Sequence, residues 1–194
     1  MRRRAECRGI AASLLLALLA LPVAASAFDM TELMALMQRV ESSRVAFEET
    51  KYVSTLTAPL VRLGTLRYVR PDRLEMHVET PYFERMDIVG DLLTIETKRG
   101  VRQVNLAEEP GPRAWVASIR ATLAGDRNTL ARHFAFQLSG QDARWTLTLK
   151  PLDPALAGFI WRVTIEGEQA QLMRIEVDER MGDRTVLVVQ PGVK

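Results

Sequence analysis

The chain has 194 residues, of which 47% are hydrophobic, and its formal net charge is +2. Without residues 1–27 it loses four arginines and one glutamate, so the net charge falls to −1, which argues against a nucleic-acid partner. The single cysteine, Cys7, lies in the same segment, so the rest of the chain excludes disulfides and thiolate chemistry.

The first 27 residues read as a targeting segment. Four arginines lie within the first eight residues, an apolar run extends from Ile10 to Val23, and Ala25-Ser26-Ala27 is a small-residue cleavage site. The apolar run is shorter than the ~20 residues of a spanning helix. We therefore expect a signal peptide cleaved after Ala27, export to the periplasm, and one soluble, unlipidated domain over 28–194.

The mature chain begins with a predicted amphipathic helix. Asp29 can cap the helix, Glu32 has the spacing of a capping box, and Phe28 with Leu33 has that of a hydrophobic staple. Apolar residues then recur at helical spacing, which predicts one buried stripe made of Leu33, Leu36, Met37 and Val40.

Short apolar runs separated by turn residues follow, and they predict an antiparallel meander. The clearest run lies after the corner Arg70-Pro71-Asp72, where Leu74, Met76 and Val78 alternate with polar residues. One face of this strand is therefore predicted to be apolar and the other to be polar and exposed to solvent. The expected strands are 44–53, 60–69, 73–80, 83–89, 92–97 and 101–106.

The pattern is interrupted at residues 108–112, after which 113–123 is predicted to be helical with Trp115, Ile119 and Leu123 on one stripe. A short helix is expected at 126–132. Strand alternation then resumes, in runs that begin at Phe134, Trp145, Phe159, Met173 and Arg184. The pattern predicts a mainly β (α+β) protein with about eleven strands and two or three helices, in which a curved sheet carries helices on its concave side.

No residues form a recognisable catalytic motif, so we expect no enzyme and no cofactor. Glu75, His77 and Glu79 lie at alternate positions of one strand and could hold a metal, but a solvated outer face gives the same pattern. We take the solvated face as the interpretation and expect no metal site. His133 is expected to be a surface or capping residue.

Arg70 has two interpretations. It can be an exposed turn residue, or it can reach across a sheet edge, where its five donors could bind the free carbonyls of a helix C-terminus.

Several of these segments match a known family pattern. They are Phe47-xx-Thr50, Gly64-x-Leu66-xxx-Arg70-Pro71, the alternating strand ending in Pro81, Trp145-x-Leu147-x-Leu149-x-Pro151, and Met181-Gly182-Asp183-Arg184-Thr185. With the amphipathic first helix, they resemble the LolA family of periplasmic lipoprotein carriers over nearly the whole mature chain.

The resemblance implies an unclosed antiparallel β-barrel of about eleven strands with a helical lid over an apolar cavity. Family members take acylated lipoproteins from an inner-membrane transporter and pass them to an outer-membrane receptor. Arg70 matches the family's arginine that holds the lid closed. The chain stops at Lys194, so we expect it to lack the C-terminal extension of typical carriers.

We therefore expect a monomeric carrier of acylated lipoproteins. The alternatives are a carrier of a non-protein acyl lipid or polyene pigment ester, a non-carrier interaction module of the envelope, and an enzyme on acyl lipids, which would need a clustered acid/base pair. The lipid-binding cavity is predicted to be lined by Phe47, Leu66, Tyr68, Leu74, Met76, Val78, Met86, Ile88, Trp115, Ile119, Leu123 and Trp161.

Overall fold

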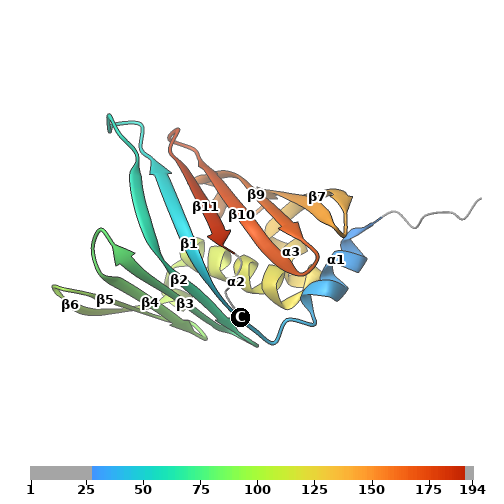
Figure 1. Ribbon diagram of the computed structural model, residues 1–194, viewed down its shortest axis with the longest axis horizontal. Coiled ribbons are helices and arrows are strands. Elements are labelled where there is room, and N and C mark those ends of the chain that lie inside the picture. The colour runs from blue at the N-terminus through green and yellow to red at the C-terminus, as the bar shows by residue number, and fades with distance from the viewer. Residues whose placement is uncertain (1–27, 191–194) are drawn as a thin grey trace, which may run out of the picture.

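The computed structural model describes residues 28–190, so the predicted signal peptide and the end of the chain at Lys194 lie outside the described residues. All strands belong to one antiparallel sheet with the order β6-β5-β4-β3-β2-β1-β11-β10-β9-β8-β7 (Figure 1). The strands are β1 (Ser42–Tyr52), β2 (Leu60–Val69), β3 (Arg73–Thr80), β4 (Glu84–Val89), β5 (Leu92–Thr97), β6 (Gly100–Asn105), β7 (Phe134–Gln141), β8 (Arg144–Pro151), β9 (Ile160–Glu168), β10 (Gln171–Glu179) and β11 (Arg184–Gln190).

The sheet consists of two meanders joined at its centre. Strands β1–β6 form a first wing and β7–β11 a second wing, and β1 pairs with β11, from Ala46 opposite Gln190 to Tyr52 opposite Arg184. The edge strands β6 and β7 do not pair with each other within the described residues. The prediction of an unclosed sheet of eleven strands is confirmed.

The helices lie on one side of this curved sheet (Figure 1). They are α1 (Met30–Met37), η1 (Leu106–Glu108), α2 (Pro110–Ala124), α3 (Arg127–His133) and α4 (Pro154–Ala157). Helix α2 begins three residues earlier than predicted, because Pro110 occupies its first turn, where the missing N–H costs nothing. The single turn α4 was not predicted; the Asp153 carboxylate caps it by accepting the N–H of Ala155 at 2.8 Å.

The predicted capping box of α1 is present. Asp29 Oδ1 accepts the N–H groups of Thr31 and Glu32 at 2.7 and 2.9 Å, and Glu32 Oε2 accepts the N–H of Asp29 at 3.2 Å. The predicted stripe is partly wrong, since Leu36 and Val40 are only half-buried and the helix ends at Met37. The buried stripe is Met30, Leu33, Met34 and Met37.

The main hydrophobic core lies in the second wing, where α1, α3 and α4 cover β7–β9. Trp145 is at its centre with 1% of its surface exposed, and its Nε1 donates to the Gln169 carbonyl at 2.9 Å. The core is completed by residues such as Leu33, Leu130, Phe134, Leu147, Leu156 and Val163. The first wing contributes no residue to this cluster.

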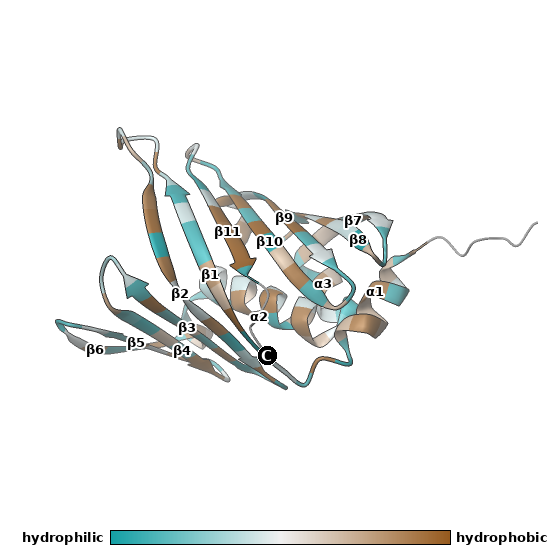
Figure 2. Ribbon diagram, in the orientation of Figure 1, coloured by the Kyte–Doolittle hydropathy of each residue, from teal (hydrophilic) through white to brown (hydrophobic). Residues whose placement is uncertain are grey.

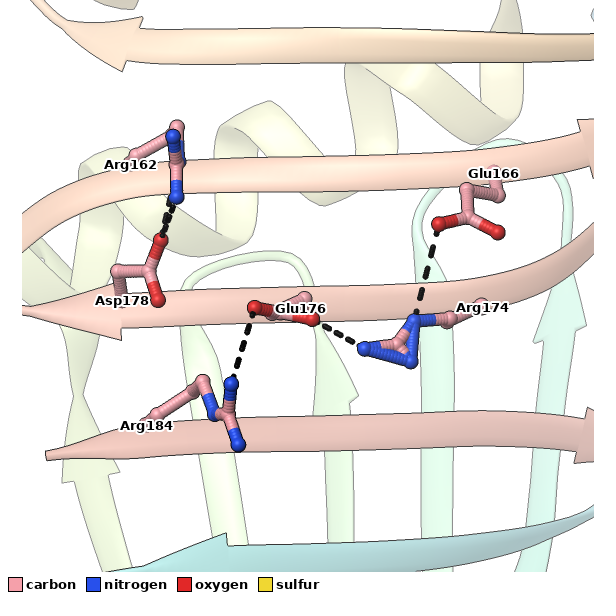
Figure 3. Close-up of polar contacts among 6 residues, drawn as sticks. All are labelled: Arg162, Glu166, Arg174, Glu176, Asp178 and Arg184. Atoms are coloured by element: carbon pink, nitrogen blue, oxygen red, sulfur yellow. Dashed lines mark hydrogen bonds and ion pairs between the residues drawn. The ribbon is translucent and has the colours of Figure 1, made fainter.

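The opposite face of the second wing is charged. Arg162 binds Asp178 at 2.7 Å, Arg174 binds Glu166 at 3.7 Å and also Glu176, and Arg184 approaches Glu176 at 3.8 Å, across β9, β10 and β11 (Figure 3). The helices lie behind these strands in the same view. Both hydrophobic and hydrophilic residues occur along β2, the C-terminal half of β1 is mainly hydrophilic, and hydrophobic residues dominate β11 (Figure 2). The sheet face beneath the helices is the apolar one.

Candidate functional site

A cavity of about 780 Å³ lies between α2 and the inner face of the sheet. Its wall comes from β1–β5 of the first wing and from β9–β11 of the second, and α2 covers it. Most of the residues around it are aliphatic or aromatic. The predicted residues that line it are Leu66, Tyr68, Leu74, Met76, Met86, Ile88, Trp115, Ile119 and Leu123.

Helix α2 has two different faces. Trp115, Ile119 and Leu123 point to the cavity, whereas the opposite face carries small buried residues. Ser118 and Thr122 satisfy their buried hydroxyls on backbone carbonyls of the same helix at 2.7 and 2.9 Å. Because the small face packs against the other helices, the large apolar side chains are left facing empty space above the sheet.

Phe47 and Val78 do not border the cavity, although both belong to the inner face. They are 2% and 1% exposed, and Gly64 lies between them in the pairing register. A Cβ at Gly64 would lie 1.9 Å from the His77 carbonyl oxygen, so this position must be glycine. With no side chain between them, Phe47 and Val78 are sealed into the wall rather than exposed to the cavity.

Trp161 was wrongly assigned to the cavity. It is 49% exposed, and the Arg180 guanidinium lies 4.6 Å from the centroid of its ring. In the pairing of β9 with β10, Arg162 faces Asp178 and Ile160 faces Glu179, which leaves Trp161 as the extra residue of a β-bulge. The bulge reverses the alternation, so Ile160 lines the cavity instead.

The second wing contributes wall residues that the sequence predictions missed. Ile175, Val177, Leu187 and Val189 line the cavity, as does Leu93 of the first wing. The alternation of β10 and the β-branched run of β11 contained the signal for them. Only the pairing of β1 with β11 places these residues beside the first wing.

Arg70 joins the sheet to the ends of two helices. Its Nη2 donates to the Gln38 carbonyl at 2.8 Å and to the Ala124 carbonyl, the last residue of α2, at 3.4 Å. Nε lies 3.4 Å from the Val40 carbonyl and 3.7 Å from a carboxylate oxygen of Glu41. A cation at these C-termini also interacts favourably with the helix dipoles.

The α1–α2 junction is held by a second contact. Gln38 Nε2 donates to the Gly125 carbonyl at 3.1 Å, and Gly125 caps α2 in the left-handed region at φ 68°. A Cβ at Gly125 would lie 2.3 Å from the Met34 carbonyl oxygen. Only glycine allows the two helix ends to come this close.

The inner wall also carries an ion-pair cluster. Glu49, whose side chain is 8% exposed, lines the cavity and accepts Arg62 Nη2 and Nε at 2.6 and 2.8 Å. Arg62 Nη1 also reaches Glu84 at 3.2 Å. Sequence reasoning missed this cluster, although Glu49 continues the inward alternation of Val45 and Phe47.

Two further buried polar groups have shifted pKa values: Tyr68 lines the cavity, whereas Arg120 is not among the lining residues. Burial raises the pKa of the Tyr68 phenol, while the nearby Arg70 charge acts in the opposite direction. Burial also lowers the pKa of Arg120 of α2, against the effect of the carboxylates of Asp72 and Asp91. Arg120 was not predicted as a site residue, and it follows Ile119 of the apolar stripe in the sequence.

Residues 28–190 contain no group of three or more His, Cys, Asp or Glu side chains that could hold a metal ion. His77 packs edge-on against Phe83, with ring centroids 5.5 Å apart. None of the helices within this range has the length and hydropathy to span a membrane.

The family model described as "Outer membrane lipoprotein carrier protein LolA-like" matches residues 22–190. Among solved structures, a LolA superfamily protein from Nitrosomonas europaea shares 10% identity at a TM-score of 0.46, over 83% of this chain and 90% of that one. The lipoprotein LppX of Mycobacterium tuberculosis shares 15% identity at a TM-score of 0.42, over 84% and 97%. A putative outer membrane lipoprotein-sorting protein domain from Vibrio parahaemolyticus shares 12% at 0.41, over 85% and 92%. None of the curated proteins matches this chain.

Proposed function

Because this chain belongs to the LolA-like family of outer membrane lipoprotein carrier proteins, we propose that it is a periplasmic carrier that shields acyl chains of lipoproteins in its cavity. It would receive them from an inner-membrane transporter and deliver them to an outer-membrane receptor. The observation that carries this proposal is the apolar cavity of about 780 Å³ between α2 and the sheet.

The cavity suits an acyl chain in size and chemistry. Its volume lies within the range of about 300–1,000 Å³ that ligand pockets occupy. Burial of a methylene group contributes about 0.8 kcal/mol, so a chain of about 15 methylenes gains ~12 kcal/mol before the entropy of ordering is subtracted. This gain in free energy is large enough to keep an acyl chain in the cavity, and out of water, during transfer between the membranes.

We propose different roles for the first wing and the second wing. The core beneath α1, α3 and α4 stabilises the second wing and includes Ala114 and Ala121 of α2. Over the first wing, α2 is held by Arg70 and by ion pairs such as Arg113 to Asp91 at 3.2 Å. These contacts are few and partly exposed. Helix α2 is therefore the element we propose as the lid, with Arg70 holding it closed.

Such a carrier has no energy source of its own. Loading requires a lid that opens at a cost smaller than the gain from acyl burial, and release requires an acceptor with a better site. We propose that it acts as a binding protein and not as an enzyme.

The test is purification of the mature protein from its own periplasm without detergent, followed by native mass spectrometry and lipid extraction. A bound acylated polypeptide is the expected result. A free lipid or polyene ester would replace lipoprotein by a non-protein cargo. Protein that is empty and also takes up no added acyl probe would contradict carriage, and a stable protein partner in a pull-down would then support an interaction module.

A further inference from the structure

Glu49 places a charge in the wall of a largely apolar cavity. It lines the cavity from β1, although its side chain is only 8% exposed. A buried ion pair such as that of Glu49 with Arg62 is rarely more stable than apolar side chains of similar volume. The residue opposite Glu49 on β11 is Leu187, which lines the cavity too, so a leucine in place of Glu49 would continue the apolar wall. Stability of the fold therefore gives no reason for a carboxylate here.

Only one of the two oxygens of this carboxylate has a partner in the protein. Arg62 Nε and Nη2 both donate to Glu49 Oε1, at 2.8 and 2.6 Å, and Oε2 accepts no hydrogen bond from residues 28–190. Oε2 is not enclosed either, since the enclosed side-chain atoms without a partner in this range belong to Tyr68, Asp87 and Arg120. Because Glu49 borders the cavity, Oε2 is accessible to a ligand that lies there.

The ion-pair cluster lies at the end of the first wing away from the lid contacts. Arg70 and Asp91, which hold α2, lie in the corners that follow β2 and β4. Glu49, Arg62 and Glu84 lie toward the other ends of their strands, near the hairpins that join β1 to β2 and β3 to β4. The β1–β2 hairpin extends beyond α2 (Figure 1). A cargo whose acyl chain lies beneath α2 would therefore present its head group to Glu49.

The charges of the cluster favour a cationic head group. Glu49 and Glu84 bring two negative charges, and Arg62, which binds both, brings one positive charge. An ionised carboxylate has only acceptor atoms, so Oε2 requires a hydrogen-bond donor. A hydroxyl, an amide and an ammonium can all donate, but only the ammonium also balances the remaining negative charge. A carboxylate or phosphate group would bring acceptors and a like charge, so neither fits.

We propose that Glu49 binds a primary ammonium at the head of the acyl cargo, with Arg62 holding the carboxylate in position. This inference rests on the proposed function and deepens it, because it requires an acyl chain in the cavity. The shared chemistry is an ammonium close to acyl chains. The free N-terminal amine of a diacylated lipoprotein can supply it, and so can the head group of an amino lipid.

The first experiment measures displacement of diphenylhexatriene, a hydrocarbon probe without polar atoms, from the purified mature protein. The competitors are dodecylammonium, dodecyltrimethylammonium and dodecanoate, which share a twelve-carbon chain; the second has the charge of the first but no N–H. The variants are Glu49→Gln and the double variant Glu49→Leu with Arg62→Met, each referred to its own uptake of the probe. The control is Glu48→Gln, which changes the exposed neighbour on the same strand.

We expect half-displacement to need about tenfold more dodecylammonium in both Glu49 variants, a much smaller shift for the other two competitors, and wild-type behaviour in the control. The double variant leaves no unpaired charge in the wall, so it keeps the test decisive if Glu49→Gln fails to fold. Unchanged displacement by dodecylammonium overturns the inference and leaves acyl carriage intact. An equal shift for dodecyltrimethylammonium also overturns it, because no hydrogen bond would then be involved. Failure of wild-type protein to take up the probe overturns the proposed function, and the inference with it.

A second experiment separates the two sources of the ammonium. One pair of competitors is a diacylated lipopeptide with a free N-terminal amine and its N-acylated form, and the other is phosphatidylethanolamine and phosphatidylglycerol. A preference for the free amine that Glu49→Gln abolishes assigns the ammonium to a lipoprotein. A preference for phosphatidylethanolamine that Glu49→Gln abolishes assigns it to a lipid. If neither pair shows a preference that depends on Glu49, the inference is overturned.

Discussion

The contacts of Arg70 predict how fast cargo enters. Only the bond to Gln38, at 2.8 Å, is short, whereas the contacts to Val40 and Ala124 are 3.4 Å or longer and weaker. A charged hydrogen bond contributes about 1.5–3 kcal/mol. Because the Arg70 side chain is 26% exposed, water can replace part of the hydrogen bonding that stabilises the closed lid. We therefore expect Arg70→Leu to destabilise the closed lid by ~2 kcal/mol.

A loss of ~2 kcal/mol raises the population of the open lid about thirtyfold. If entry requires the open lid, the initial rate of diphenylhexatriene uptake in a stopped-flow experiment rises by the same factor. The control is Arg73→Leu, which removes an arginine that pairs with Asp87 at 3.0 Å. Equal uptake rates for Arg70→Leu and wild type would refute the reasoning, and would make Arg70 a structural turn residue only.

Three further predictions concern stability. Gly125→Ala should lower the free energy of unfolding by about 2 kcal/mol more than Gly182→Ala, in urea denaturation, because both have positive φ but only Gly125 has a carbonyl oxygen 2.3 Å from the new Cβ. Arg62→Met should cost ~2 kcal/mol by leaving the buried Glu49 carboxylate without its partner, and the double variant with Glu49→Leu should recover most of it; no recovery would contradict this. Asp126→Ala should cost ~1 kcal/mol at neutral pH through loss of the α3 cap. Hydrogen bonds hold the Asp126 pKa below 3.8, so its contribution is present above that value and the difference from wild type should shrink as the pH falls below it; a difference independent of pH would be inconsistent with this.

The fold was largely predictable because its signals are local. Alternation at Leu74 and Met76 sets the face of β3, and turn residues end the strands, so their number followed without knowledge of the pairing. The prediction that Trp161 lines the cavity was wrong because its orientation depends on a non-local feature. A bulge depends on the register between two strands, and nothing in the alternation of one strand reports it.

The polar parts of the site were less accessible to sequence reasoning. The contact between Arg70 and helix carbonyls could be predicted because Arg70 lies in the turn Arg70-Pro71-Asp72, where its side chain can reach across the edge of the sheet. The partner of Glu49 is set by the register between β1 and β2, and the neighbours of Arg120 are set by how α2 lies over the sheet. No spacing along the chain encodes either arrangement. Apolar faces follow from periodicity, whereas polar partners depend on tertiary geometry.

The central pairing of β1 with β11 has a consequence for how the protein is made. Each wing can form from hairpins between neighbouring segments, but β1 must wait for β11, which is synthesised last. Long-range pairing of this kind is slow, because the chain entropy of closing the loop is lost before the contacts form. Under the proposed export, in which the chain emerges N-terminus first, the two halves of the cavity wall would therefore be joined only after translocation is nearly complete. For the proposed carrier, this order of strands would delay completion of the cavity until the last strand has arrived.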